Sequence, residues 1–252
     1  MIRRRAYRAL SWALFFTVVL LAGPLAALAL GMAPWGSDWS RASNRSIGVA
    51  PDPADHPGAV VQAYAARTFG WRGAFAVHTW IAAKPAGAER YTRYEVIGWH
   101  GRGGGSTVAI SQARAPDAEW YGQAPELLRD LRGADAEAVI SRLPAVVEAY
   151  PYATGYRMWP GPNSNTFIAH IARAIPELEL ALPANAIGKD WLPLGEPFAR
   201  APSGTGWQAS LYGVLGVTAA AKEGLEVNVL GLVIGVDPGA PAVKFPGVGH
   251  VP

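Results

Sequence analysis

The chain has 252 residues, of which 50% are hydrophobic and 16% are charged, and it contains no cysteine. Soluble domains usually carry about 25% charged residues, so this composition is poor in charge and excludes a disordered or nucleic-acid-coating tail. The lack of cysteine excludes disulfides, thiolate zinc sites, iron–sulfur clusters and a catalytic thiol. The length suits one domain with a small extension.

The N-terminus predicts a membrane anchor. Its first eight residues contain no acid and four arginines: Arg3, Arg4, Arg5 and Arg8. The stretch from Ala9 to Ser37 carries no charge, and about 20 apolar residues suffice for a helix to cross a bilayer. Because basic residues stay on the cytoplasmic side, we predict a cytoplasmic segment over residues 1–9 and a transmembrane signal anchor over 10–32. A cleavable signal peptide, cut after Ala27-Leu28-Ala29, is the alternative, although its apolar core is normally only about 7–15 residues.

The positive charge of the chain belongs to this anchor. The net charge is +3, and removing the four N-terminal arginines leaves 18 basic residues against 19 acidic ones. The remaining body is therefore close to neutral and has no basic groove for nucleic acid. We expect a single-pass protein of the inner (cytoplasmic) membrane, with its C-terminal domain periplasmic or otherwise extracytoplasmic.

The rest of the chain predicts a Pro-rich linker over residues 33–58 and an exported α+β domain over residues 59–252. Three segments rich in apolar and aromatic residues predict strands: 59–66, 74–83 and 91–99. Three others predict helices: 125–131, 135–148 and 166–173. Residues 207–221 and 225–236 predict one long C-terminal β-hairpin. The expected fold is a small antiparallel sheet packed on helices, with this hairpin beside it.

His78 is the first candidate for chemistry. It lies in a predicted strand, where alternation places it on one face with Trp80, while Val77 and Thr79 take the other. A histidine among apolar residues also suits a core position. The chain lacks the histidine spacings typical of metal sites, so we expect no metal and no cofactor.

The second candidate is the segment WPGPNSNTF, residues 159–167. Its Pro/Gly turn delivers Asn163, Ser164 and Asn165 to the start of a helix. These residue types are typical helix caps, which is one interpretation. Alternatively, Ser164 is a nucleophile beside an oxyanion site formed by free backbone N–H groups, with His78 as its base.

Several motifs resemble a bacterial family known only as domain of unknown function 3750. They are HTWIAAKPAG, YEVIGW, WPGPNSNTF, PEL, AIGKDW, PSGTGW, EGLEVNVLGL and FPGVGH. The resemblance covers residues 46–251 and suggests a Gram-negative cell envelope, but it implies no activity.

A more distant likeness, to circularly permuted papain-like proteins of the NlpC/P60 type, implies more about a site. In these proteins a histidine on an early strand precedes a nucleophilic cysteine at a helix N-terminus. His78 matches the histidine and Ser164 stands where the cysteine would be. Glu95 matches the polar residue that orients the histidine, with Tyr94 and His100 as alternatives. Serine in place of cysteine places peptidase activity in doubt, because a hydroxyl does not ionise near neutral pH.

Two functions therefore remain open. The first is a non-catalytic binding or scaffolding module with a papain-like cleft for a peptide, glycan or lipid. The second is an envelope hydrolase or acyltransferase that acts on an amide or ester. The residues assigned to this site are the catalytic candidates Ser164, His78 and Glu95 and the oxyanion or substrate-binding candidates Asn163, Asn165, Trp80 and Trp159.

Overall fold

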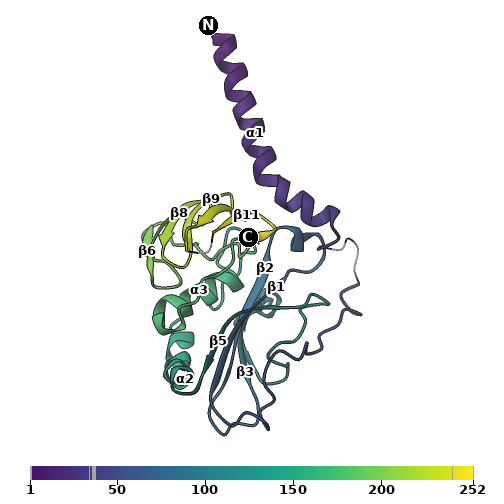
Figure 1. Cartoon of the computed structure of the whole chain (residues 1–252), viewed down its shortest axis with the longest axis vertical. Helices are drawn as coiled ribbons and strands as arrows, with labels where there is room; N and C mark the ends of the chain where they lie inside the picture. Colours follow the sequence, from purple (N-terminus) through teal and green to yellow (C-terminus); the bar gives the residue numbers. More distant parts are fainter. Residues whose placement is uncertain (1, 34, 36–37, 240, 252) are drawn as a thin grey trace.

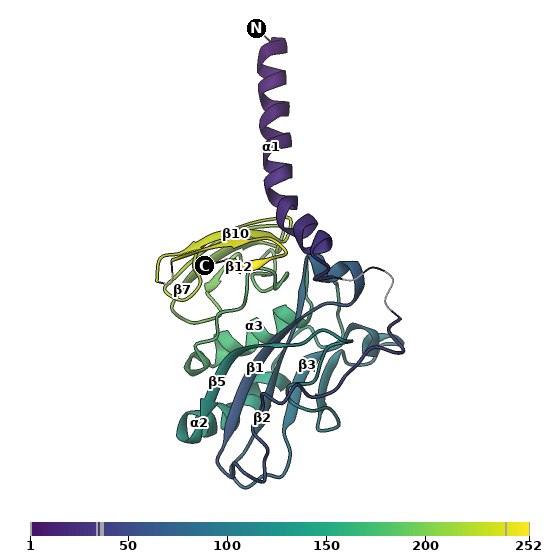
Figure 2. The same cartoon turned by 45° about the vertical axis from the view of Figure 1, so that its right-hand side comes forward.

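The computed structural model describes residues 2–33, 35, 38–239 and 241–251 (Figures 1 and 2). Its fold is of the predicted α+β class, but it has two antiparallel sheets where one sheet and a hairpin were expected. An N-terminal helix, α1 (Ile2–Ala29), projects from the body. Among the described residues, α1 is a helix long and apolar enough to cross a membrane, over Leu10–Ala29. A membrane anchor and a signal sequence both have these properties.

The first sheet has the strand order β4-β3-β2-β1-β5, and neighbouring strands are antiparallel. Its strands are β1 (Val60–Arg67), β2 (Val77–Lys84), β3 (Thr92–Val96), β4 (Val108–Ser111) and β5 (Glu126–Arg132). The 3-10 helices η1 (Gly70–Ala74) and η2 (Gly98–Gly101) follow β1 and β3. The three predicted strands of this region are therefore confirmed, with β2 beginning three residues later than expected.

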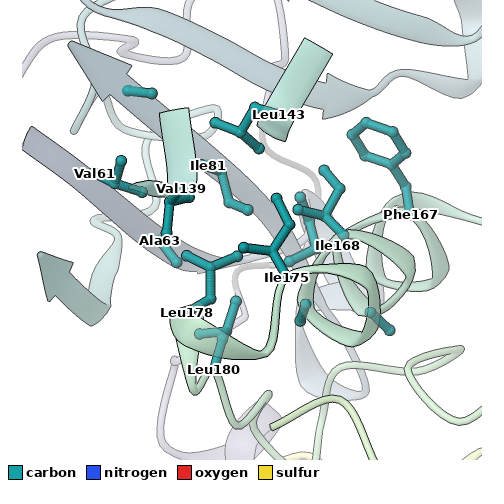
Figure 3. Packing of buried hydrophobic residues seen from close by; sticks show 14 of the residues in the cluster. Val61, Ala63, Ile81, Val139, Leu143, Phe167, Ile168, Ile175, Leu178 and Leu180 are labelled. Carbon is teal, nitrogen blue, oxygen red and sulfur yellow. The ribbon is translucent and has the colours of Figure 1, made fainter. Parts of the chain in front are cut away.

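One face of the first sheet packs on two helices, α2 (Gly133–Glu148) and α3 (Ser164–Ala174), and on the short η3 (Pro176–Leu178). Their apolar positions recur at helical spacing and meet the strands in one core, shown in Figure 3. The labelled core residues are Val61, Ala63, Ile81, Val139, Leu143, Phe167, Ile168, Ile175, Leu178 and Leu180. Both helices were predicted close to their observed bounds.

The predicted helix over residues 125–131 is wrong, because this segment forms β5. Its backbone pairs with the otherwise free edge of β1, from Val60 opposite Arg132 to Ala65 opposite Glu126. The adjacent Leu127 and Leu128 then pack in the cores on opposite faces of the sheet. A free sheet edge offers a full ladder of hydrogen bonds, which here outweighs local helix propensity.

The other face of the first sheet is covered by irregular chain. Tyr64, Trp80 and Trp120 form a second apolar core there. Part of the predicted linker is attached to this layer, because the buried Asp117 carboxylate accepts hydrogen bonds from Val49 N at 2.6 Å and Ala50 N at 3.1 Å. The linker thus includes residues that help to enclose the domain.

The second sheet replaces the predicted C-terminal hairpin. Its seven strands run in sequence order from β6 to β12: β6 (Phe198–Arg200), β7 (Gly206–Leu211), β8 (Leu215–Ala220), β9 (Gly224–Val229), β10 (Leu232–Asp237), β11 (Ala242–Phe245) and β12 (Gly249–Val251). Each segment expected to be one long strand is itself a tight hairpin. The turn at Leu230 and Gly231 has positive φ at both residues, a conformation usually signalled by Asn-Gly, so the sequence did not reveal it.

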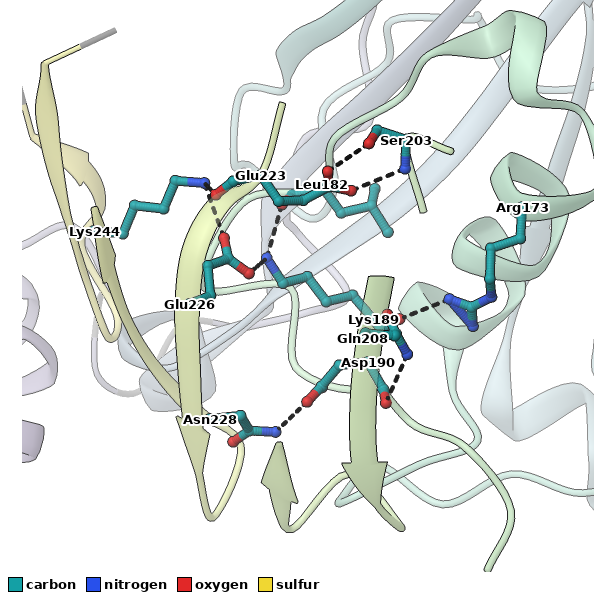
Figure 4. Close-up of polar contacts among 10 residues, drawn as sticks. All are labelled: Arg173, Leu182, Lys189, Asp190, Ser203, Gln208, Glu223, Glu226, Asn228 and Lys244. Atoms are coloured by element: carbon teal, nitrogen blue, oxygen red, sulfur yellow. Dashed lines mark hydrogen bonds and ion pairs between the residues drawn. The ribbon is translucent and has the colours of Figure 1, made fainter. Parts of the chain in front are cut away.

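The face of the second sheet that meets the body is polar and buried (Figure 4). Glu226 lies between two lysines: Lys189 Nζ is 2.7 Å from Oε2 and Lys244 Nζ is 2.9 Å from Oε1. Beside them, the Asp190 carboxylate accepts a hydrogen bond of 2.6 Å from Asn228 Nδ2. Burial alone raises the pKa of Glu226, but the two lysines outweigh it and hold that pKa below its usual value. The carboxylate is therefore ionised and paired.

Candidate functional site

Two predicted site residues, His78 and Glu95, are in direct contact. His78 Nε2 lies 2.8 Å from Glu95 Oε2, and Arg93 Nη2 donates a hydrogen bond of 3.0 Å to the same oxygen. All three side chains are buried. Alternation along β3 places Arg93 and Glu95 on one face of the sheet, and β2 presents His78 to that face.

Aromatic rings hold the His78 imidazole in place. It stacks on Trp120 with ring centroids 3.7 Å apart and lies near Trp80 at 5.8 Å. The Arg93 guanidinium lies over the Trp80 ring at 4.3 Å, a cation–π contact that favours the charged arginine. Trp80 and His78 therefore share a face, as predicted.

Burial and pairing set the charges of this site. Burial lowers the pKa of His78 and outweighs the opposite effect of Glu95. Burial raises the pKa of Glu95, but His78 and Arg93 outweigh it and bring that pKa to about 2. At neutral pH, Glu95 is thus ionised and His78 is neutral, donating from Nε2 and leaving a lone pair on Nδ1.

These shifts predict that acid destabilises the fold. His78 has a folded pKa below the 6.5 of an unperturbed histidine, so stability falls once the unfolded chain takes up a proton below that pH. Glu95 adds a loss of about 3 kcal/mol as the pH falls from its ordinary value of 4.5 to about 2. Thermal unfolding of the full chain in detergent between pH 7.5 and 2 measures both losses.

His78→Gln keeps a donor for Glu95 but cannot titrate, so it should reduce the loss between pH 7.5 and 5.5. His170, whose pKa burial also lowers, contributes in the same direction, and His170→Gln is the matched comparison. A wild-type melting temperature that stays constant down to pH 5 would contradict the prediction.

The start of α3 is a helix cap, as one interpretation of the sequence expected. The Asn163 side-chain oxygen accepts from the backbone N–H groups of Asn165 at 2.9 Å and Thr166 at 3.2 Å, and Thr166 Oγ1 accepts from Asn163 N at 3.2 Å. The Asn163 amide also donates to the carbonyl of Ile187 at 2.9 Å. This reciprocal capping box fixes both the helix start and the loop before β6.

Asn165 joins α3 to β2. Its Oδ1 accepts a hydrogen bond of 2.9 Å from Thr79 Oγ1, and its Nδ2 donates to the Val77 carbonyl at 3.0 Å. Because Thr79 faces α3, its neighbour His78 points to the opposite face of the sheet, where it meets Trp120. In the described part of the chain, no hydrogen bond joins Ser164 to His78.

The remaining predicted residues are spread over the molecule. Trp80 is fully buried, so it supports His78 and presents no surface to a ligand. Trp159 is 48% exposed and donates a hydrogen bond of 2.8 Å to the Leu230 carbonyl in the second sheet. Of the alternatives to Glu95, Tyr94 packs against the core shared with α3, and His100 is exposed on η2.

Sequence reasoning missed two members of the site, Arg93 and Trp120. The sequence could have indicated Arg93, because it stands two residues before Glu95 in a predicted strand and therefore shares its face. No sequence pattern indicated Trp120, because it lies in an irregular segment. Within the described residues, no group of three His, Asp or Glu side chains is placed to hold a metal ion.

A cleft opens beside this site. It has a volume of about 670 Å³ and is bordered by residues of the segments 46–53, 90–91 and 112–117. Arg114 lines it and also lies over the Trp120 ring at 5.1 Å, so the cleft reaches the aromatic layer that holds His78.

Comparison with known proteins gives a family but no activity. Neither the curated proteins nor the solved structures yielded a match to the chain. A family model described as a protein of unknown function (DUF3750) matches residues 58–191, more than half of the chain. The match runs from β1 to Trp191 and leaves out α1 and the second sheet. This match is shorter than the range covered by the sequence motifs, residues 46–251, but it identifies the same family. The chain therefore belongs to the DUF3750 family.

Proposed function

We propose that this protein is a membrane-anchored binding or scaffolding domain of a bacterial cell envelope. Residues 10–32 form the anchor in the inner membrane, residues 1–9 stay in the cytoplasm, and the linker and domain (33–58 and 59–252) lie outside it. Support comes from the length of α1 and from the four arginines, all of which precede the uncharged stretch.

One observation carries the non-catalytic role: α3 and the His78 ring are on opposite faces of β2. The Thr79–Asn165 hydrogen bond fixes α3 against one face, while Trp120 and Glu95 hold His78 on the other. A serine nucleophile needs a base within hydrogen-bond reach. Asn163 and Thr166 at the start of α3 are used in capping, and Asn165 is used in bonds to β2, so these groups stabilise the fold without chemistry.

The cleft at segments 46–53 and 112–117 is the proposed binding site. Arg90, Gln112 and Arg114 offer hydrogen-bond donors at its border, while Tyr91 and the prolines supply apolar surface. Peptides and glycans present carbonyl, hydroxyl and carboxylate groups that suit such donors. These are the ligand classes that we assign to the cleft.

A second candidate function, a Ser/His-dependent amide or ester hydrolase or acyltransferase, is favoured by the His78–Glu95 hydrogen bond. That bond orients a neutral imidazole with a free Nδ1 lone pair, as the third member of a catalytic triad does. This arrangement would also fit a distant, permuted papain-like relation. Ser164 would then be the nucleophile, with Asn163 or Asn165 beside the oxyanion.

Labelling with a serine-reactive fluorophosphonate separates the two functions. We expect wild type, Ser164→Ala and His78→Ala to label equally weakly, because no base activates Ser164. Ser141→Ala, which removes an exposed serine on α2, is the matched control. Labelling that disappears in both Ser164→Ala and His78→Ala but persists in Ser141→Ala would establish the hydrolase and overturn the non-catalytic role.

Thermal unfolding of wild type and two arginine variants tests the cleft, with chitotetraose and an alanine pentapeptide as probes. If the cleft binds either probe, the probe raises the melting temperature of wild type, and Arg114→Ala abolishes the shift. Arg142→Ala, which removes an exposed arginine on α2, should keep it. A shift that survives Arg114→Ala, or no shift with either probe, would contradict this assignment.

A further inference from the structure

The second sheet presents an apolar face to the outside. Its strands alternate between buried and exposed positions, so each strand contributes outward residues two apart. The large exposed hydrophobic residues on these strands are Phe198, Trp207, Leu211, Leu215, Val217, Leu225, Val227, Val236, Val243 and Phe245. Register places Val217 opposite Val227 and Leu225 opposite Val236, so these side chains form one continuous surface.

The polarity of this sheet is reversed relative to a sheet that faces water. Its charged and amide side chains, among them Glu226, Asn228 and Lys244, point inward and are buried (Figure 4). A half-buried sheet in water normally turns its apolar side inward and its polar side outward. An apolar exterior around a polar interior is the arrangement of sheets that contact lipid.

The apolar face is also large. Strands β7 to β10 have six residues each, and at about 3.4 Å per residue and about 4.8 Å between strands they alone cover roughly 400 Å². Contiguous apolar patches of this size are as large as the largest patch on a typical soluble monomer and are often functional. Among the described residues of these strands, Arg200 on the edge strand β6 is the charged one on this face, and its guanidinium lies 4.2 Å over the Trp207 ring.

The position of the face points to its occupant. The backbone of α1 touches the second sheet, because a side chain on Gly23 would clash with the Pro246 carbonyl, and one on Gly247 would meet Pro24. Arg67 Nη1 also donates a hydrogen bond of 2.8 Å to the Gly247 carbonyl. Figures 1 and 2 show the sheet at the end of the body from which α1 projects, while the first sheet extends away from it.

We propose that the outer face of the second sheet lies in the interfacial layer of the bilayer beside α1, with lipid acyl chains as its occupant. The inference rests on α1 acting as a membrane anchor, as proposed above. A spanning α1 places this face at the membrane surface. Leucine and valine dominate the face, whereas protein interfaces concentrate their binding energy in Trp, Tyr and Arg. The Arg200–Trp207 pair at its edge suits the headgroup level, where arginine and tryptophan are enriched.

Because the chain has no cysteine, single-cysteine variants of the full protein can report on each surface. Val217→Cys and Val227→Cys probe the outer face, Leu14→Cys probes α1, and Ile110→Cys probes an equally exposed position on β4 of the first sheet. Each variant carries an environment-sensitive NBD fluorophore and is reconstituted into phosphatidylcholine–phosphatidylglycerol vesicles. Spin labels on the acyl chains then quench fluorophores that contact lipid.

The expected result is at least twofold stronger quenching at positions 14, 217 and 227 than at position 110. Quenching at 14 without quenching at 217 and 227 would overturn the lipid contact and leave the anchor standing. Quenching at 217 and 227 without quenching at 14 would overturn the anchor and support the lipid contact. A blue shift of the NBD emission at 217 and 227 without quenching would assign the face to a protein partner. Quenching at 110 as strong as at 217 and 227 would indicate non-specific adsorption. Both outcomes contradict the proposal.

Discussion

Replacing Glu226 by glutamine is expected to lower the free energy of unfolding by about 3–5 kcal/mol. The carboxylate lies between the buried ammonium groups of Lys189 and Lys244, at 2.7 Å and 2.9 Å. Glutamine keeps the shape of the side chain but removes the charge that both lysines need, so two buried cations lose their counter-ion. Chemical unfolding of the full chain in mild detergent measures the loss.

Two variants show whether burial is the cause. Glu177→Gln removes an exposed carboxylate that pairs with Arg142 at 2.7 Å, and it should cost no more than about 1 kcal/mol because water screens that pair. The triple variant Lys189→Met/Glu226→Leu/Lys244→Met replaces the whole cluster with apolar side chains of similar size. It should recover most of the stability, since such replacements of buried ion pairs are often neutral. A loss below about 1 kcal/mol for Glu226→Gln would show that the cluster is solvated in the native protein.

Glu95→Ala is expected to have a comparable effect, about 3–5 kcal/mol, in the first sheet. The substitution leaves the Arg93 guanidinium buried without a counter-ion and removes the acceptor of His78 Nε2. Because Glu95 raises the pKa of His78, its removal should lower that pKa further. Chemical unfolding measures the first effect, and NMR titration of the His78 ring measures the second.

Glu89→Ala, on the exposed β2–β3 connection, is the control and should change stability by no more than about 0.5 kcal/mol. Glu95→Gln retains a neutral acceptor for His78 and should lie between the two. If Glu95→Ala were as stable as Glu89→Ala, the Arg93 guanidinium would have another counter-ion or would be solvated. The assignment of Glu95 as the central group of this site would then fail.

The features predicted correctly from the sequence are those that a short segment decides by itself. Asn163, one of the three predicted capping residues, and the apolar spacing behind it locate α3, although the second member of the capping box is Thr166. Alternation in β2 places His78 with Trp80, and the contacts of both rings agree. Glu95 was selected by likeness to other proteins, with Tyr94 and His100 as alternatives, and its hydrogen bond to His78 needed the tertiary structure.

The errors arose where a segment depends on a distant partner. Residues 126–132 contain adjacent leucines that suit a helix, but the free edge of β1 makes them a strand. The C-terminal strands turn at Tyr212-Gly213 and Leu230-Gly231, which lack the usual Asn-Gly signal, so four strands of the second sheet were predicted as the two strands of one hairpin. Trp120 stacks on His78 from an irregular segment that no periodicity could place.

The sequence by itself determined the apolar N-terminal helix, the start of α3 and the alternation of the strands, because composition, capping and period are local properties. Only the tertiary structure decided which face of each strand is covered. Alternation places Val217 and Thr218 on opposite faces of the sheet, but it does not say which face is buried. Lys189 and Asp190 pack against the face that carries Thr218, and this contact makes it the buried one. In the same way, Asn165 binds one face of β2 and leaves His78 on the opposite one, so the placement of α3 separates Ser164 from the base that its sequence context suggested.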